Sequence, residues 1–217
     1  MTGPVLPGPV LPSPVLASPT GRPTRFRDDA RGVAAIEFAL VLPVLVALYF
    51  GMTELVRAVD TSRKATLYAR TIADLSGRAT NGSPTVSDMA AILNASGAIM
   101  RPYPTTDLQV AIHAMGVENV SGNLLGGVCS SYPQNARPVL TLNGSNGLPA
   151  TPATFQYDGA RYILAEVSIS YTPVIGSTLF RSIFGGRGLV FSRQVSWAQR
   201  LDKGEVIMPG GAKCPNF

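Results

Sequence analysis

The chain has 217 residues, of which 46% are apolar and only 14% are charged, and its formal net charge is +5. This balance disfavours an intrinsically disordered chain, a collagen-like chain and a small disulfide-rich scaffold. It leaves a membrane protein open, so the location of the surplus apolar residues becomes the first question.

Residues 1–32 read as a Pro-rich leader. The triplet Pro-Val-Leu begins at Pro4, Pro9 and Pro14, and a basic stretch follows that ends at Arg31. Proline stiffens the chain and lacks a donor N–H, so no packed core is expected here. A cleaved or disordered leader is favoured over a polyproline ligand, and these residues are set aside from the fold.

Residues 33–52 form a continuous apolar segment in which Glu37 is the only charged residue. Twenty helical residues rise about 30 Å, which matches the hydrocarbon thickness of a bilayer. The segment therefore predicts a transmembrane helix. Pro43 removes one backbone hydrogen bond, so we expect a kink there.

Residues 53–76 predict an extramembrane continuation of the same helix. Neither Pro nor Gly occurs between Met52 and Ser76, and apolar residues recur at helical spacing at Ala65, Tyr68, Ala69, Ile72 and Leu75. The turn residues that begin at Asn81 predict its end.

Residues 77–217 predict an α+β domain. Alternating apolar residues indicate strands over 108–117, 163–171 and 189–198, and Ser87 is a candidate cap for a short helix. The Gly-, Asn-, Ser- and Pro-rich stretch 118–159 is expected to be a long exposed excursion with at most one short strand at 139–142. The predicted fold is a long N-terminal helix packed on a small antiparallel sheet of three or four strands.

Residues for ordinary enzyme chemistry are scarce. The chain has a single His (His113) and two Cys, which nearly removes zinc sites, His-centred triads and iron–sulfur clusters. No phosphate-binding, dinucleotide-binding or nucleophile motif is present, and the Arg residues are not clustered as in a nucleic-acid interface. We expect no catalysis, no cofactor, no metal and no nucleic-acid partner. A membrane-tethered enzyme is the alternative, and its candidate carboxylates carry no motif: Asp107, Glu118, Asp158 and Glu166.

Glu37 requires an explanation, because a carboxylate near the start of a bilayer helix is costly unless it serves a purpose or lies at the interface, where the helix dipole tolerates it. Its context is a basic leader that ends in Gly32, four small or apolar residues, then Glu37, Phe38 and the apolar run. This arrangement resembles a class III signal sequence, the site cut by a prepilin peptidase. The segment is similar to the pilin superfamily, and most closely to the TadE-like pseudopilins and minor pilins of the tight-adherence (Tad/Flp) pilus system.

The resemblance implies a role for each motif residue. Gly32 precedes the cut, Val33 becomes the new N-terminus, and Glu37 and Phe38 are the fifth and sixth mature residues. Glu37 would pair with the Val33 ammonium of a neighbouring subunit during assembly. Phe38 favours a minor pilin or pseudopilin over the main subunit, whereas TadF-like and short TadG-like relatives stay open.

The implied partners are the prepilin peptidase, other pilins or pseudopilins, and the inner-membrane pilus assembly platform. The implied location is the bacterial inner membrane, with a cytoplasmic N-terminus and a periplasmic C-terminal domain, in a system for surface adhesion. An oxidising periplasm favours a disulfide between Cys129 and Cys214 over two free buried thiols.

Two further interpretations remain open. The first is a signal-anchored periplasmic binding domain that is never cleaved. The second is an ordinary secretory signal peptide, which is disfavoured because Glu37 interrupts the apolar run and no A-x-A cleavage site closes it.

Overall fold

The computed structural model describes residue 3 and residues 32–79, 82–175, 177, 178, 182, 188–201 and 204–214. Contacts divide the chain into two compact units, one up to Leu48 and one from Tyr49 to Phe217. Of the leader predicted for residues 1–32, only Gly3 and Gly32 are among the described residues.

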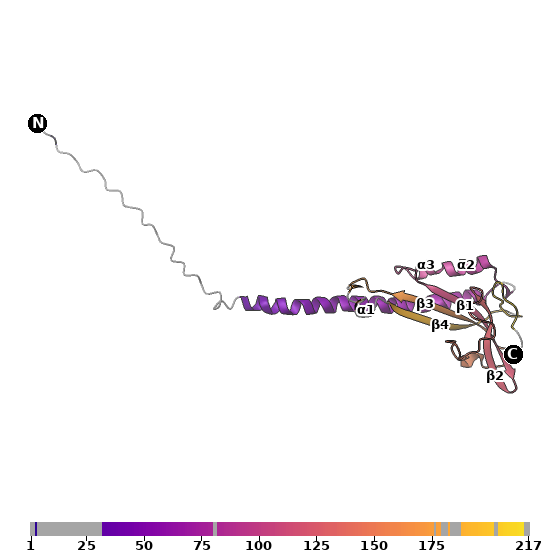
Figure 1. Cartoon of the computed structure of the whole chain (residues 1–217). Coiled ribbons are helices and arrows are strands. Elements are labelled where there is room, and N and C mark those ends of the chain that lie inside the picture. The colour runs from indigo at the N-terminus through magenta and orange to yellow at the C-terminus, as the bar shows by residue number, and fades with distance from the viewer. Residues whose placement is uncertain are drawn as a thin grey trace. The chain divides into compact units, whose positions relative to one another are not determined.

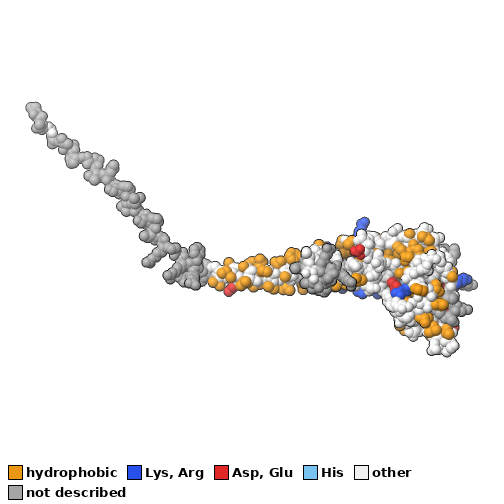
Figure 2. All heavy atoms as spheres, viewed as in Figure 1, with side chains coloured by type: hydrophobic (Ala, Val, Ile, Leu, Met, Phe, Trp, Pro, Cys, Tyr) orange, Lys and Arg blue, Asp and Glu red, His pale blue; other side chains and the backbone are white. Residues whose placement is uncertain are grey.

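Helix α1 spans Val33–Gly77 and confirms the long helix expected from the sequence (Figure 1). Its first part is apolar on every side, and an 18-residue window reaches a mean hydropathy of 2.4 with none of its residues buried. Hydrophobic side chains cover the visible face of this part in Figure 2. By length and composition, α1 is therefore able to cross a membrane.

Four antiparallel strands form a single sheet in the second unit, in the order β2-β1-β3-β4. Their bounds are β1 Gln109–Val120, β2 Asn123–Tyr132, β3 Arg161–Tyr171 and β4 Leu189–Ala198. The two residues between β1 and β2, Ser121 and Gly122, have φ values of 52° and 87°. Positive φ at both positions matches the right-handed twist of the strands and closes a tight hairpin. The predicted α+β class is confirmed.

The exposed excursion expected over 118–159 is wrong for Asn123–Tyr132, because these residues form strand β2. The expected short strand at 139–142 is also wrong, since Leu142 forms only an isolated bridge to Gly127. Glycine lowers the strand propensity of a segment, but in β2 it permits close packing. A Cβ on Gly126 would collide with the side chains of Asn143 and Thr151, which belong to the loop that covers the strand.

Two short helices connect α1 to the sheet, α2 (Val86–Asn94) and α3 (Ser96–Ile99). The cap of α2 is Thr85 rather than the expected Ser87. The Thr85 hydroxyl accepts a hydrogen bond from the backbone N–H of Asp88, and the Asp88 carboxylate accepts one from the backbone N–H of Thr85. This reciprocal pair satisfies two helix-end donors, whereas Ser87 lies inside the first turn.

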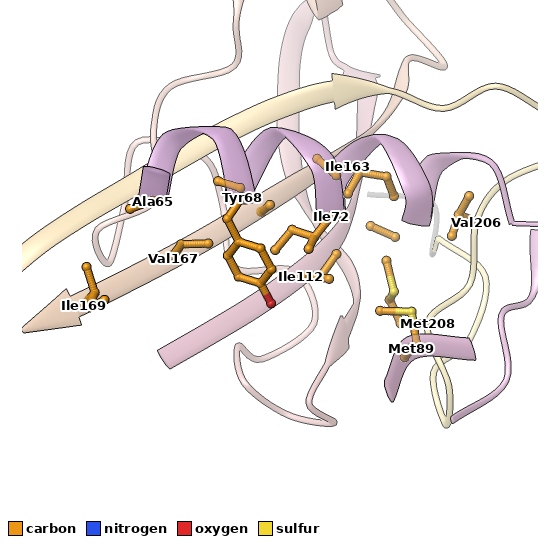
Figure 3. Packing of buried hydrophobic residues seen from close by; sticks show 14 of the residues in the cluster. Ala65, Tyr68, Ile72, Met89, Ile112, Ile163, Val167, Ile169, Val206 and Met208 are labelled. Atoms are coloured by element: carbon orange, nitrogen blue, oxygen red, sulfur yellow. The ribbon is translucent and has the colours of Figure 1, made fainter. Parts of the chain in front are cut away.

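The main core lies between the C-terminal part of α1 and one face of the sheet (Figure 3). Tyr68 and Ile72 are fully buried there against Ile112 on β1 and Ile163 on β3. The Tyr68 hydroxyl donates to the Leu93 carbonyl at 3.0 Å, so its polar end is satisfied inside the core. The helical spacing of apolar residues in 53–76 thus produces the contact that it predicted, except that Leu75, the last residue of the pattern, is exposed.

A second, smaller core lies on the opposite face of the sheet. It contains Tyr162 and Leu164 of β3 beneath the connection between β2 and β3, where the ring of Phe155 stacks on Tyr162 at a centroid distance of 4.6 Å. Both faces of β3 are therefore covered, which explains its nearly continuous burial.

Replacing Ile72 with Ala tests the main core. We expect the free energy of unfolding to fall by about 2–5 kcal/mol, because the substitution removes buried methyl groups and leaves a cavity. Leu67→Ala, on the exposed side of the same helix (56% exposed), is the matched control and should change it by less than about 1 kcal/mol. Denaturant unfolding of the full chain in detergent, followed by the fluorescence of Trp197, measures both. Equal effects of the two variants would contradict this packing.

Candidate functional site

The motif predicted to direct processing lies at the beginning of α1. Gly32 directly precedes the helix, Val33 is its first residue, and both are exposed. Glu37 follows Val33 by four residues, so the two side chains lie about one helical turn apart on the same side of α1. Phe38 is also exposed. The residues singled out by the sequence therefore occupy one short stretch of accessible helix.

Glu37 is a single carboxylate within an apolar surface. Val33, Ile36, Phe38 and Leu40 around it are all exposed hydrophobic residues. Among the described residues, no Lys, Arg or His lies within ion-pair distance of Glu37. A carboxylate in such surroundings favours a cationic partner, since removal from water is costly for an isolated charge.

Helix α1 continues through Pro43. Proline has no backbone N–H, so the carbonyl of Ala39 loses its usual partner four residues later. The predicted kink at Pro43 stays a prediction.

Glu54 fastens the end of β3 to α1, within the second unit. Its carboxylate accepts hydrogen bonds from the Tyr171 hydroxyl at 2.5 Å and from the backbone N–H groups of Val174 and Ile175 at 3.2 and 2.9 Å. Arg57, one turn along the helix, lies 3.9 Å from the same carboxylate. This arrangement, which we call the Glu54 clamp, was not predicted, because its partners are separated by more than 100 positions in the sequence.

The clamp changes the acid–base properties of both partners. Burial raises the pKa of Glu54, but hydrogen bonds from Tyr171, Ile175 and Val174 outweigh it and leave the pKa below its usual value. Burial and the neighbouring carboxylate together raise the pKa of the Tyr171 hydroxyl. Glu54 is therefore ionised and Tyr171 is neutral at physiological pH, which is the pairing that a charge-assisted hydrogen bond requires.

Two more polar contacts join α1 to β4. Arg193 donates to the Ser62 hydroxyl at 2.5 Å, and the indole N–H of Trp197 donates to Asp74 at 2.9 Å. Asp74 also forms ion pairs with Arg78 and Arg200. Together with the Glu54 clamp, these contacts fix the helix against the sheet at three successive positions.

A polar cluster around the buried His113 lies on the face of the sheet opposite α1. Arg137 donates to both oxygens of Glu166 at 3.0 and 2.8 Å, and Gln194 donates to one of them at 2.7 Å. His113 has no exposed surface, and its ring nitrogens lie 3.2 Å from Glu166 and 2.9 Å from the Ser131 hydroxyl. The sequence placed no carboxylate beside His113, because strand pairing alone brings Glu166 next to it.

The candidate carboxylates of the enzyme interpretation do not converge. Glu118 pairs with Arg161, Asp158 accepts a hydrogen bond from the Asn119 backbone, and Glu166 lies in the polar cluster. Asp107 lines a separate cavity of about 270 Å³ beside Tyr103. The cluster that combines Ser131, His113 and Glu166 has a fully buried histidine. Among the described residues, no group of three or more His, Cys, Asp or Glu is placed to hold a metal ion.

Cys129 and Cys214 form the predicted disulfide, with their Cα atoms 4.5 Å apart. Cys129 is the extra residue where the pairing register of β1 and β2 shifts. Gly116 of β1 lies directly beneath the sulfurs, where a Cβ would collide with them. Glu205 accepts hydrogen bonds from Arg161 and from the backbone N–H of Cys214. The C-terminal segment is thereby held against the hairpin.

Comparison with protein families gives one match. The model described as TadE-like protein matches residues 32–74. This segment of the chain is TadE-like. The match begins at Gly32 and includes Val33, Glu37, Phe38 and Pro43, so the resemblance read from the motif is confirmed over this stretch. Comparison with curated proteins and with solved structures gave no match.

The TadE-like segment runs across both units of the chain. It contains the exposed apolar part of α1 and also the buried Tyr68 and Ile72 of the main core. The sheet, the polar cluster and the disulfide lie outside the matched residues. The family match therefore covers most of helix α1 and does not extend to residues 75–217.

Glu166 should make folding stability sensitive to acid. Burial raises its pKa, but hydrogen bonds and positive charge from His113 and Arg137 outweigh it and lower the pKa from 4.5 to about 2. Because the folded-state pKa lies below the ordinary value, this contribution to stability is complete above pH about 4.5 and is lost as the pH falls towards about 2. Glu166→Gln should cost about 1.5–3 kcal/mol at pH 7 and should flatten the acid dependence.

Denaturant unfolding of the full chain at several pH values measures this effect. Asp107→Asn, which removes an exposed carboxylate, is the control and should leave the acid dependence close to that of the unmodified protein. An unchanged acid dependence in Glu166→Gln would refute the role of the cluster.

Proposed function

We propose that this chain is a pseudopilin or minor pilin of a Tad-type pilus. In this proposal a prepilin peptidase cleaves it between Gly32 and Val33, and the mature protein helps to assemble or prime the pilus for surface adhesion. The observation that carries the proposal is the TadE-like match, which begins at Gly32. A TadE-like segment indicates a protein associated with the Tad pilus system.

The local geometry supports processing at this position. Gly32 is exposed immediately before α1, and a Cβ added there would meet no atom within 4 Å among the described residues. A small, accessible residue next to a helix start suits a peptidase that must bind the backbone closely. Cleavage there would leave an ammonium group on Val33, one helical turn from Glu37.

Pairing between subunits gives Glu37 its function in this proposal. A carboxylate in the apolar part of a membrane costs about 2.5–3.5 kcal/mol at the centre of the bilayer, and less near the interface. The Val33 ammonium of a neighbouring subunit would compensate this charge when the helices pack together. Because only one register brings the two charges into contact, the pair would also align the subunits.

The chain would act by assembly rather than by catalysis. Its partners would be the prepilin peptidase, other pilins or pseudopilins and the inner-membrane assembly platform. The apolar part of α1 would cross the inner membrane once, with the N-terminus in the cytoplasm. The disulfide between Cys129 and Cys214 supports a periplasmic location for the sheet, because such bonds persist in oxidising compartments.

Mass spectrometry of the mature protein tests the processing step. Co-expression with a prepilin peptidase should yield a new N-terminus at Val33. Gly32→Val should abolish this product, because a branched side chain crowds the bond to be cut. Gly51→Val is the matched control, since it makes the same substitution at an equally unobstructed position of α1 and should leave cleavage intact.

A full-length product in the presence of active peptidase would contradict this function and would favour an uncleaved, signal-anchored domain. A cut at an unrelated position would also contradict it.

Substitution of Glu37 tests the assembly step separately. Glu37→Val should be cleaved normally but should be lost from complexes with other pilins, because the neighbouring ammonium would have no partner. Ile36→Val, an apolar change at the adjacent position, should be cleaved and incorporated. Recovery of cross-linked subunits from membranes, with mature N-termini checked by mass, measures both steps. Normal incorporation of Glu37→Val would refute the charge-pairing role.

A further inference from the structure

Exposed apolar side chains occur on α1 and on the segment after β3, close to Glu54. Leu55 and Val56 on the helix are 63% and 67% exposed, and Val174 and Ile175 after β3 are 67% and 42% exposed. All of these residues belong to the unit that begins at Tyr49. Aliphatic groups grouped in this way indicate a surface that meets something other than water.

The Glu54 clamp fixes the position of Val174 and Ile175 along the axis of α1. Because the backbone N–H groups of Val174 and Ile175 both bind the Glu54 carboxylate, their segment is held beside that residue. Glu54 follows Met52, the last residue of the apolar stretch, by two positions. At 1.5 Å per helical residue this separation is about 3 Å along the axis.

A distance of about 3 Å is shorter than the polar layer of a bilayer, which adds roughly 5–8 Å on each side of the hydrocarbon core. If the apolar stretch of α1 spans the membrane, Val174 and Ile175 must then lie at the level of the lipid headgroups. Aliphatic side chains at that depth gain by contact with the acyl chains, as they do in interfacial segments.

The charges around the surface fit a lipid partner as well. Arg57 is partly exposed on α1, and Arg63 and Arg193 lie farther from the apolar stretch. Arginine suits the phosphate groups of lipids, because its guanidinium donates several hydrogen bonds at once. The Glu54 carboxylate is already satisfied by the clamp, whereas Asp107 lines the same cavity as Arg57 and Val174. Among the described residues, the aliphatic groups thus lie beside Glu54, and Arg57 is the nearest positive charge.

We propose that Val174 and Ile175, held by Glu54, dock into the headgroup region of the membrane and form a second contact of the folded domain with the bilayer. This inference rests on the membrane-spanning role assigned to α1 under the proposed function. The contact would restrict the tilt of the domain relative to the membrane surface, because two separate points of attachment define an orientation that a single helix does not.

Site-specific fluorescence quenching tests the contact. The full chain, with its native cysteines joined in the disulfide, receives a single new cysteine that carries an environment-sensitive dye and is placed in phospholipid vesicles. Val174→Cys places the dye on the proposed surface. Leu124→Cys, exposed near the β1–β2 hairpin, is the control, and Leu45→Cys in the apolar stretch reports insertion of α1 itself. Lipids that carry a nitroxide near the headgroup or deep in the acyl chain serve as quenchers.

We expect the dye at Val174 to be quenched severalfold more by the shallow nitroxide than the dye at Leu124, and the dye at Leu45 to be quenched by the deep nitroxide. If Leu45 is quenched but Val174 behaves like Leu124, the docking inference is wrong and the membrane anchor stands. If Leu45 and Val174 are both unquenched, the anchor fails and the inference fails with it.

A variant that disrupts the Glu54 clamp tests whether the clamp positions Val174 at the membrane. Glu54→Ala removes the acceptor for Val174 and Ile175, so quenching at Val174 should decrease while quenching at Leu45 stays unchanged. Asp60→Ala, which removes a carboxylate farther along α1, is the matched control and should preserve quenching at Val174. The fluorescence of Trp197, which lies at the other end of β4, verifies that each variant is folded. Undiminished quenching in Glu54→Ala would show that the clamp does not position this surface.

Discussion

The packing of α1 on the sheet determines the position of almost every other feature between Tyr49 and the C-terminus. Ala65, Ala69 and Ala73 are spaced four residues apart and are fully or almost fully buried, so the helix backbone approaches the strands closely. Tyr68 and Ile72 fill the space beside this narrow stripe. Small residues permit the approach and large ones occupy the remaining volume, which is how protein interiors reach their high density.

Polar contacts then select one placement of the helix among those that the apolar stripe would tolerate. Glu54, Ser62 and Asp74 each bind a partner on or just after β3 or β4. They span 20 residues, or about 30 Å of helix. Because hydrogen bonds require specific distances and angles, a shift of α1 by one turn would break all three contacts at once. Apolar packing supplies most of the stability here, and these polar pairs supply the register.

The same helix meets two different requirements along its length. After Thr53 a stripe of small and apolar residues from Ala58 to Ala73 faces the sheet, whereas before that point apolar side chains are exposed on all sides. A surface of that kind needs lipid or other apolar helices around it, since isolated soluble proteins rarely expose such extended apolar areas. Glu37 is the exception within this surface. Its position one turn after Val33 makes a charge on the helix start the simplest partner, and in the proposed function this pair would connect the membrane helix to assembly.

The sequence by itself determined the long helix, its apolar and amphipathic parts, the α+β class and the motif from Gly32 to Phe38, because all of these depend on residues close together in the chain. It also identified β1, β3 and β4 through their alternating apolar residues. It missed β2, whose Gly126 and Gly127 reduce strand propensity, although a Cβ on Gly126 would collide with Asn143 and Thr151. Only the tertiary structure decided that Glu54 would hold Val174 and that His113 would meet Glu166. These contacts join residues 50 to more than 100 positions apart, and strand order and register bring them together. Neither strand order nor register is encoded in local periodicity, so chemistry that depends on them cannot be read from the sequence alone.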